Sequence, residues 1–193
     1  MRARPGSLAA MLLLAALLTL ERARAQLPEE LPLHHPRALA GAGVSFPSGG
    51  NTTDTYRGGV HGFAALTYGV RPGTGLRAEV TYSRYSPHAL HGLPPADPRW
   101  GRVISATMNV VQHLPRDTRP YVIGGGGFYQ VRGSWLKPEG DTEPMTTRNT
   151  VGGSIGAGTR LGPRLFVEAR HHLAYRSYEG SARYVPITVG WIF

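Results

Sequence analysis

Two short segments carry opposite charges two residues apart, which makes them the best candidates for ion pairs in this sequence. Arg77 and Glu79 flank one alanine, and Glu168 and Arg170 flank another. In an extended strand, residues two apart point to the same side, so each segment would present a cation and an anion together. If the segments face each other in the fold, they could form either a relay for protons or ions or a structural set of salt bridges.

Histidines are the other residues that could do chemistry, as metal ligands or as bases. Six of them occur in three groups: His34-His35, His88 with His91, and His171-His172. Metal sites need ligands that converge on one point, whereas adjacent strand residues point to opposite sides, and a proline-rich loop implies no fixed geometry. The run Gly124–Gly127 lacks the lysine-serine pair and the following helix of a phosphate loop. The sequence therefore predicts no metal and no cofactor.

The composition limits the elements that could position these residues. The 193 residues include 26 glycines, 16 prolines and no cysteine, and the mean hydropathy is -0.21. Glycine and proline disfavour helix interiors, and the sequence lacks the several apolar runs of about 20 residues that a polytopic helical membrane protein needs. Without cysteine there is no disulfide, thiol nucleophile or cysteine zinc site. These observations favour an all-β protein with one main domain.

Residues 1–25 have the layout of a cleaved secretory signal peptide. Arginines precede an apolar run from Leu8 to Leu20, and residues 23–25 supply a small-x-small cleavage site. Removal of this segment takes away four arginines and one glutamate, so the formal charge falls from +9 to +6. We interpret residues 26–37 as a periplasmic lead-in and residues 38–193 as the folded domain. An exported chain rarely meets nucleic acid, so anionic lipid and lipopolysaccharide are the expected partners of its surface arginines.

From residue 38 onward, hydrophobic and polar residues alternate with the period of a β-strand. In the clearest segment, Leu76–Tyr85, every second residue from Leu76 to Tyr82 is apolar or aromatic. The same period, in places diluted by glycine, occurs in seven further segments: 38–46, 60–70, 104–110, 121–132, 150–161, 165–170 and 185–193. Short turns (71–75, 115–119 and 162–164) alternate with longer polar loops (47–58, 86–101, 133–147 and 176–183). This pattern predicts an eight-stranded, antiparallel, up-and-down β-barrel with two unlike ends, as in transmembrane barrels.

The alternation leaves open which face is inside, and a soluble periplasmic barrel with an apolar, ligand-binding interior is an alternative. Two observations favour a membrane barrel. Residues on the polar faces include many small ones, as a narrow interior requires: Gly124, Gly126, Gly156, Gly158, Ser105 and Ser154. The same faces carry charges of opposite sign that could pair in a lumen. We expect a structural polar network there, consisting of Arg77, Glu79, Asn109, Gln130, Arg160, Glu168 and Arg170.

The last residues of the chain carry a family resemblance. Hydrophobic residues occupy every second position up to a terminal aromatic: Val185, Ile187, Val189, Trp191 and Phe193. This resembles the C-terminal signature strand of bacterial outer-membrane proteins, and residues 63–77, 119–129 and 152–172 look like the small eight-stranded barrels of the OmpA-like and OmpX-like family. The resemblance implies a Gram-negative outer membrane and recognition of the last strand by the barrel assembly machinery. Aromatic residues near strand ends are expected to form two interfacial girdles: Tyr68, Tyr82, Tyr121, Tyr129, Tyr175, Trp191 and Phe193.

The expected function is structural and interactive, with four loops presented at the cell surface and no enzymatic activity. One alternative is a narrow conduit for ions or small solutes through the lumen. Another follows from the resemblance, because some small outer-membrane barrels modify lipid A with a serine-histidine pair on a lipid-facing strand. His171 is expected to face outward near Ser177 in sequence, but the tight histidine-x-serine spacing of those enzymes is absent and no acid is placed beside His171.

Overall fold

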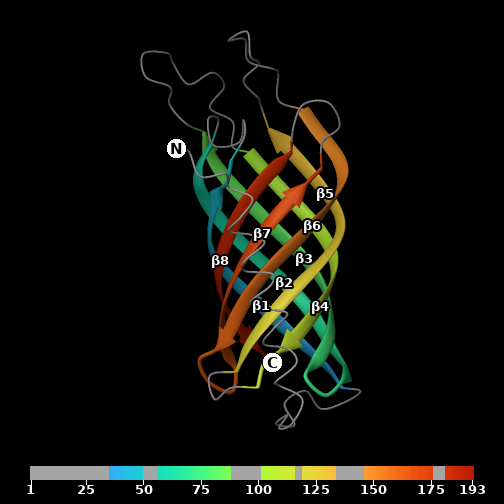
Figure 1. Cartoon of the computed structure of the whole chain (residues 1–193). Coiled ribbons are helices and arrows are strands. Elements are labelled where there is room, and N and C mark those ends of the chain that lie inside the picture. Colours follow the sequence, from blue (N-terminus) through green and yellow to red (C-terminus); the bar gives the residue numbers. More distant parts are fainter. Residues whose placement is uncertain (1–34, 50–55, 88–100, 116–118, 134–145, 176–180) are drawn as a thin grey trace, which may run out of the picture.

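The computed structural model describes residues 35–49, 56–87, 101–115, 119–133, 146–175 and 181–193. Within them lie eight strands: β1 (Pro36–Pro47), β2 (Tyr56–Arg71), β3 (Thr74–Pro87), β4 (Gly101–His113), β5 (Pro120–Gly133), β6 (Thr146–Arg160), β7 (Leu165–Ala174) and β8 (Ala182–Ile192). Each strand pairs antiparallel with the next, and β1 pairs with β8, so the sheet closes into a barrel (Figure 1). The predicted all-β, eight-stranded, up-and-down architecture is confirmed.

The two ends of the barrel differ in the lengths of their connections. The links β2–β3, β4–β5 and β6–β7 lie at the lower end in Figure 1, near the C-terminus, and we call this the short-turn end. In the two-residue link Pro72–Gly73, Gly73 has a φ of 72°, which a residue without a Cβ adopts at little cost. The longer links leave the opposite, long-loop end. Their residues 50–55, 88–100, 134–145 and 176–180 lie outside the described residues.

The first strand begins two residues earlier than the sequence pattern indicated. The predicted signal peptide and most of the predicted lead-in lie outside the described residues. Pro36 and Arg37, however, belong to β1 and pair with Tyr68 and Thr67 of β2. Proline is tolerated at the first position of a strand, where no ladder hydrogen bond is lost. The last two residues assigned to the lead-in therefore extend the barrel wall.

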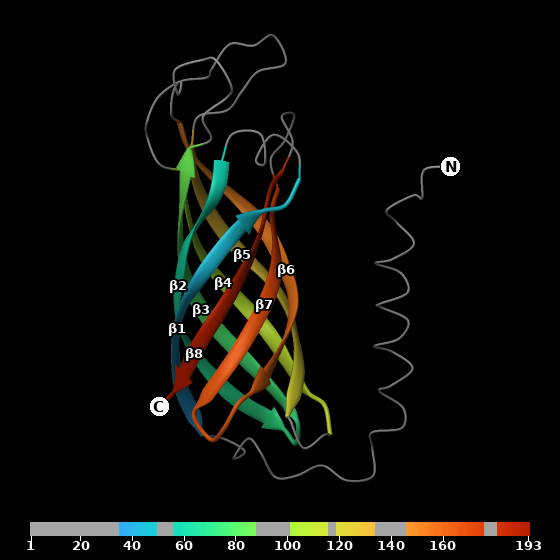
Figure 2. The same ribbon diagram turned by 90° about the vertical axis from the view of Figure 1, so that its left-hand side faces the viewer.

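The apolar faces of the strands point outward and the charged faces point into the lumen. On the outer face Val80 is 57% exposed and Phe128 is 74% exposed, and the other large apolar side chains there include Val60, Leu66, Met108, Ile155 and Val189. In the C-terminal strand, Ile187, Val189, Trp191 and Phe193 are exposed on the same face, with half-buried Val185 in phase. Figure 2 shows β8 beside β1, where it closes the barrel. This arrangement is the reverse of a soluble barrel with an apolar interior.

The glycine-rich strand β5 is shifted by one residue from the expected phase. Gly125 and Gly127 lie beside the lumen-facing Asn109 and Thr107 of β4, whereas Gly124 pairs with the outward-facing Val110. The assignment of Gly124 and Gly126 to the interior was therefore wrong. Gly156, Gly158, Ser105 and Ser154 do lie on the lumen side, in phase with the buried residues of β4, β6 and β7.

The same shift changes the aromatic girdles. Tyr68, Tyr82, Tyr175, Trp191 and Phe193 are exposed on the outer surface, as expected. Tyr121 and Tyr129 instead face the lumen and are almost fully buried, so their assignment to a girdle was wrong. Both hydroxyl groups find hydrogen-bond partners inside: Glu168 for Tyr121 and His172 for Tyr129.

Two apolar clusters fill the lumen toward its ends. The cluster toward the short-turn end consists of Leu39, Phe63, Ala65, Val111, Tyr121, Ile123, Phe166 and Ile192. The cluster toward the long-loop end consists of Tyr56, Tyr85, Val103, Tyr129, Ala174, Ala182 and Tyr184. Charged and hydroxyl side chains lie between them. An eight-stranded barrel is just wide enough for side chains to fill its interior in this way.

The described part of the chain contains no helix long and apolar enough to cross a membrane.

Candidate functional site

The charged centre of the lumen is built by β3 and β7, which lie four strands apart in the closed ring of eight. Both strands start from short turns, so both run from the short-turn end toward the long-loop end. Arg77 precedes Glu79 on β3, whereas Glu168 precedes Arg170 on β7. The charge order is reversed between two strands that run the same way. Each arginine consequently faces a glutamate across the barrel.

The four side chains form a closed ring of alternating charges. Arg77 Nη1 lies 2.7 Å from Glu168 Oε2 and 3.9 Å from Glu79 Oε2. Arg170 Nε lies 2.6 Å from Glu168 Oε1, and Arg170 Nη2 donates to Glu79 Oε2. The Tyr121 hydroxyl donates to Glu168 Oε2 over 2.7 Å. Each of the four residues is only 3% exposed. The sequence segments that could pair are therefore brought together, and we call these four residues the ion ring.

The ion ring can act as a structural bridge across the barrel. The Arg77 guanidinium also lies 5.6 Å from the ring centroid of Tyr121 and 6.0 Å from that of Phe166, so it connects the charges to the cluster at the short-turn end. Burying four charges costs desolvation energy, which short, multiply bonded pairs offset. Such a ring stabilises one arrangement of the opposing strands.

The other residues assigned to the polar network are placed differently. Asn109 lies in the lumen, where its Nδ2 donates to Thr107 over 2.9 Å and its Oδ1 accepts from Ser154 over 3.3 Å. Gln130 is on the outward-facing side of β5 and bonds to Arg102 and Asn149, so the structure places it outside the lumen. The cause is the one-residue shift of β5.

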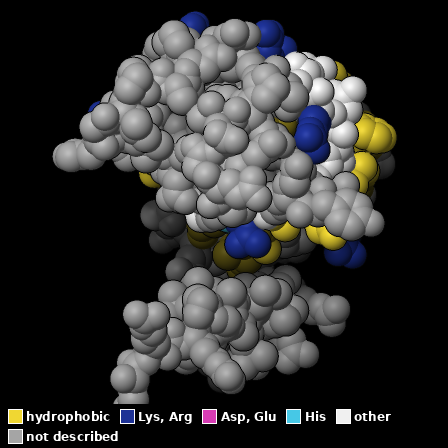
Figure 3. All heavy atoms as spheres, turned by 90° about the horizontal axis from the view of Figure 1, so that it is seen from above, with side chains coloured by type: hydrophobic (Ala, Val, Ile, Leu, Met, Phe, Trp, Pro, Cys, Tyr) yellow, Lys and Arg dark blue, Asp and Glu magenta, His cyan; other side chains and the backbone are white. Residues whose placement is uncertain are grey.

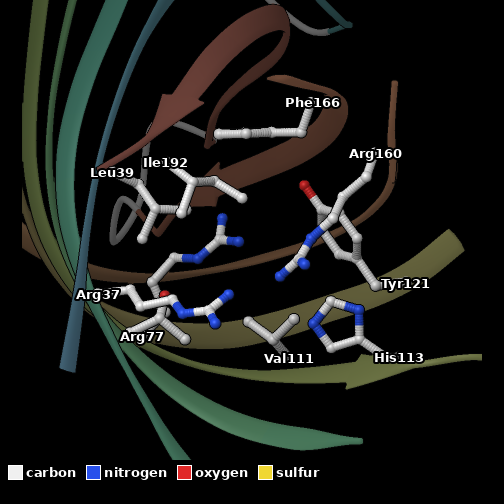
Figure 4. A pocket seen from close by; sticks show the side chains of 10 residues that line it. Arg37, Leu39, Arg77, Val111, His113, Tyr121, Arg160, Phe166 and Ile192 are labelled. Atoms are coloured by element: carbon white, nitrogen blue, oxygen red, sulfur yellow. The ribbon is translucent and has the colours of Figure 1, made fainter. Parts of the chain in front are cut away.

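Arg160 lies on the lumen side but apart from the ion ring, at the short-turn end. There it lines a small cavity together with Arg37, Arg77 and His113 (Figure 4). The position of Arg37 escaped the sequence pattern because it precedes the first recognisable alternation. His113 could have been found by extending the alternation of β4 by two steps beyond Asn109.

Sequence reasoning missed a second buried cluster toward the long-loop end. His61 Nδ1 lies 2.8 Å from Ser83 Oγ, and the Tyr129 hydroxyl lies 3.1 Å from His172 Nδ1. The rings of His172 and Tyr184 stack with their centroids 4.7 Å apart. The alternation of side chains along β2 puts His61 on the same lumen-facing side as Phe63 and Thr67. This alternation was the signal in the sequence that could have identified it. Chemically His61 and Ser83 form a base–hydroxyl pair, but both residues are buried inside the barrel wall.

The catalytic and metal hypotheses receive no geometric support from the described residues. His171 is half-buried on the outward side of β7, as expected, while Ser177, His34, His88 and His91 lie outside the described residues. Within the described ranges no group of three or more histidine, aspartate and glutamate side chains could hold a metal ion.

Three arginines form a row on the outer surface at the long-loop end. Arg84 of β3 pairs with Arg102 of β4, and Arg102 pairs with Arg132 of β5. All three share the outward phase of the apolar belt, and the carboxylates in the described part of the chain, Glu79 and Glu168, are both in the lumen. Seen from above, a few dark-blue basic side chains show at the edges of the described surface, one of them among apolar side chains (Figure 3). Like charges directly opposite on neighbouring strands repel, and Arg102 also donates to Gln130 of β5, so this part of the rim is strongly basic.

The sequence matches no protein-family model and no curated protein. Solved structures nevertheless share its fold. The crystal structure of Ail, the attachment invasion locus protein of Yersinia pestis, in complex with the heparin analogue sucrose octasulfate has 11% identity and a TM-score of 0.52 over 83% of this chain and 99% of that chain. The backbone structure of Ail in a phospholipid bilayer nanodisc has 12% identity and a TM-score of 0.55, covering 82% and 100% of the two chains. Neisserial surface protein A has 14% identity and a TM-score of 0.52, covering 81% and 95%.

At these identities the likeness concerns the fold, and it confirms the resemblance to small eight-stranded outer-membrane barrels at that level.

Proposed function

We propose that this chain is an integral outer-membrane β-barrel protein with a structural and interactive role, which presents its long loops at the cell surface. One observation carries the proposal: a belt of exposed apolar side chains surrounds the outside of the barrel, while the ion ring is buried in its lumen. A continuous belt of exposed aliphatic and aromatic side chains as large as this one is unfavourable in contact with water. In a membrane the belt contacts the hydrocarbon chains of the lipids, and the closed wall satisfies its backbone hydrogen bonds internally.

Two partners follow from this placement. The outer leaflet of such a membrane carries lipopolysaccharide phosphates at the level of the arginine row, which favours charge-assisted hydrogen bonds from Arg84, Arg102 and Arg132. The outward row of β8 that ends at Trp191 and Phe193 suits recognition by the barrel assembly machinery during insertion. The proposed signal peptide over residues 1–25 directs the chain into the export pathway that leads to this assembly machinery.

Neither enzymatic activity nor conduction is part of the proposal. The base–hydroxyl pair of His61 and Ser83 is enclosed by the wall, so a lipid substrate has no route to it. The ion ring and the two apolar clusters fill the lumen, which supports a structural interior over a conduit. An unchanged lipid A profile in a deletion strain would agree with a non-catalytic role, and an altered acylation pattern would argue against it.

A heat-modifiability gel on fractionated cells tests the membrane assignment. We expect the protein in the outer-membrane fraction, and an unboiled sample should migrate differently from a boiled one because the closed barrel resists detergent. Recovery in the soluble periplasmic fraction without such a shift would contradict the proposal.

The arginine row is tested separately by binding of the purified barrel to vesicles. A triple variant, Arg84→Gln with Arg102→Gln and Arg132→Gln, should weaken the preference for lipopolysaccharide-containing vesicles over phosphatidylcholine vesicles. A matched variant that removes three arginines from the short-turn end, Arg71→Gln with Arg119→Gln and Arg164→Gln, should keep it. If both triple variants lose the preference for lipopolysaccharide-containing vesicles equally, the preference depends on overall charge and not on the arginine row.

A further inference from the structure

We infer that the outer surface holds a binding site for one lipopolysaccharide molecule, with an acyl chain in a groove across β1–β5 and a phosphate at Arg102 and Arg132. The groove is a hollow of about 880 Å³, and residues of all five strands line it. Its volume lies within the range of roughly 300–1,000 Å³ that is common for ligand sites. The inference rests on the membrane placement proposed above and names the place on the belt where the lipid is held.

Small side chains on the outward face produce the groove. Exposed outward positions along it include Ala64, Ala78 and Ala106. Glu79 and Thr107 also line it, although their side chains are buried in the lumen, so the floor of the groove is the strand backbone itself. Large side chains stand beside this floor, among them Met108 and Phe128, which are 56% and 74% exposed.

A hydrocarbon chain packs better in this groove than on the rest of the belt. The convex wall of a barrel touches a lipid chain on one side, whereas the groove offers a floor and two flanks. Each atomic contact contributes little, but the sum grows with the number of atoms touched. Within a bilayer such packing replaces the hydrophobic effect as the force that holds apolar surfaces together. The groove should therefore retain one chain more firmly than the surrounding surface does.

Arg102 of β4 and Arg132 of β5 supply the charge that complements a phosphate. The two residues are paired directly opposite each other on the outer face. Arg102 is half-buried and donates to Gln130, and Arg132 is exposed. Neither arginine contacts a carboxylate among the described residues, whose two carboxylates lie in the lumen. Guanidinium groups bind phosphate through charge-assisted, often bidentate hydrogen bonds.

The spacing between the arginine pair and the groove fits a lipid chain in one leaflet. Ala106 lies four residues from Arg102 along β4, and Gly126 lies six residues from Arg132 along β5. These separations are about 13 and 20 Å along the strands, or about 10 and 15 Å in depth at a tilt of about 40°. One leaflet contributes about 15 Å of hydrocarbon. A lipid with its phosphate at the arginines thus places the far half of a chain in the groove, in the leaflet nearer the long-loop end, where lipopolysaccharide resides.

Binding can be measured by native mass spectrometry of the full barrel in a non-ionic detergent, with lipid A, the membrane anchor of lipopolysaccharide, as the probe. We expect the wild-type barrel to retain one lipid A. Ala106→Phe places a ring on the floor of the groove and should raise the dissociation constant at least about tenfold. Arg102→Gln with Arg132→Gln should also raise it, and Arg102→Lys with Arg132→Lys should recover part of the loss because the charge is kept.

Ala169→Phe is the matched control, because it adds the same ring to an exposed outward alanine of β7, away from the strands that line the groove. It should keep the wild-type dissociation constant. Equal losses in Ala106→Phe and Ala169→Phe would overturn the assignment of the groove. The loss of a dimer in Ala106→Phe, with lipid A still bound, would assign the groove to a second copy of the chain and overturn the proposal as well.

A second lipid tests the assignment to lipopolysaccharide. Phosphatidylglycerol also carries a phosphate and acyl chains, and equally tight binding of it by the wild-type barrel would overturn the choice of lipid. Failure of this site can be told apart from failure of the membrane placement. A heat-modifiable barrel in the outer-membrane fraction whose lipid A binding is unchanged by Ala106→Phe would remove the site alone, whereas a soluble periplasmic protein would remove both.

Discussion

The two lumen carboxylates are bonded unequally, so they should contribute unequally to stability. Glu168 accepts from Arg77, Arg170 and Tyr121, whereas Glu79 has one close partner, Arg170. Removing one member of a buried ion pair costs about 3–5 kcal/mol, because the remaining charge stays buried without compensation. We expect Glu168→Gln to lower the free energy of unfolding by about that amount and Glu79→Gln to lower it less. Urea unfolding in lipid vesicles, followed by tryptophan fluorescence, measures both.

Tyr121→Phe is the control for this ranking. It removes one neutral donor to Glu168 while keeping the aromatic ring beside Arg77, so it should cost only about 1 kcal/mol. Equal losses of unfolding free energy in Glu168→Gln and Glu79→Gln would show that the hydrogen bonds to Glu168 do not determine its contribution to stability.

At the level of the strand, alternation predicts the faces correctly where apolar and polar side chains differ in kind. In β3 the outward face carries Leu76 and Val80 and the inward face carries Arg77 and Glu79, and the structure agrees. In β5 the glycines have no side chains, so the phase rests on a few residues that suit either face. A slip of one residue moves every side chain to the other face. That slip accounts for the misplacement of Gln130, Tyr121 and Tyr129 together.

The ion ring was predictable in part. The spacing of the charged residues indicates that Arg77 and Glu79 share a face, and likewise Glu168 and Arg170. That the two pairs face each other follows once strand order and closure are known, because β3 and β7 are then opposite and run in the same direction. Strand ends are harder to predict, which is why Arg37 and His113 were found in the structure alone.

The phase of β5 gives a prediction for two adjacent glycines. A Cβ at Gly125 would meet the carbonyl oxygen of Met108 and the side chain of Asn109, whereas a Cβ at Gly124 would meet only the carbonyl oxygen of Ser154 at an ordinary 3.6 Å. Gly125→Ala should therefore destabilise the barrel by about 1–3 kcal/mol through overpacking. Gly124→Ala should change stability by no more than about 0.5 kcal/mol. Unfolding midpoints from heat-shift gels compare the two, and the reverse order would restore the phase first deduced from the sequence.

At the scale of the whole molecule, the environment of the outer belt, lipid or water, determines how much a charged side chain on it lowers the stability of the barrel. Val80 lies halfway along β3 and is 57% exposed between the apolar faces of β2 and β4. In a bilayer, Val80→Arg should destabilise the barrel by about 2–4 kcal/mol, the cost of an arginine at the midplane. Val80→Leu should stay near wild type. Urea unfolding in vesicles measures both, and a neutral effect of Val80→Arg would mean that water, not lipid, surrounds this belt.

The filled interior gives the last prediction, which separates a structural lumen from a conduit. Ions would have to pass the cluster around Phe166, the ion ring and the cluster around Tyr184, all almost fully buried. In planar bilayers we expect no stepped conductance from the wild-type barrel. Glu168→Ala should lower stability without opening a path, because the apolar clusters on both sides of the ion ring remain in place. Wild-type current steps that Glu168→Ala changes, with unfolding unaffected, would instead make Glu168 part of a conducting path.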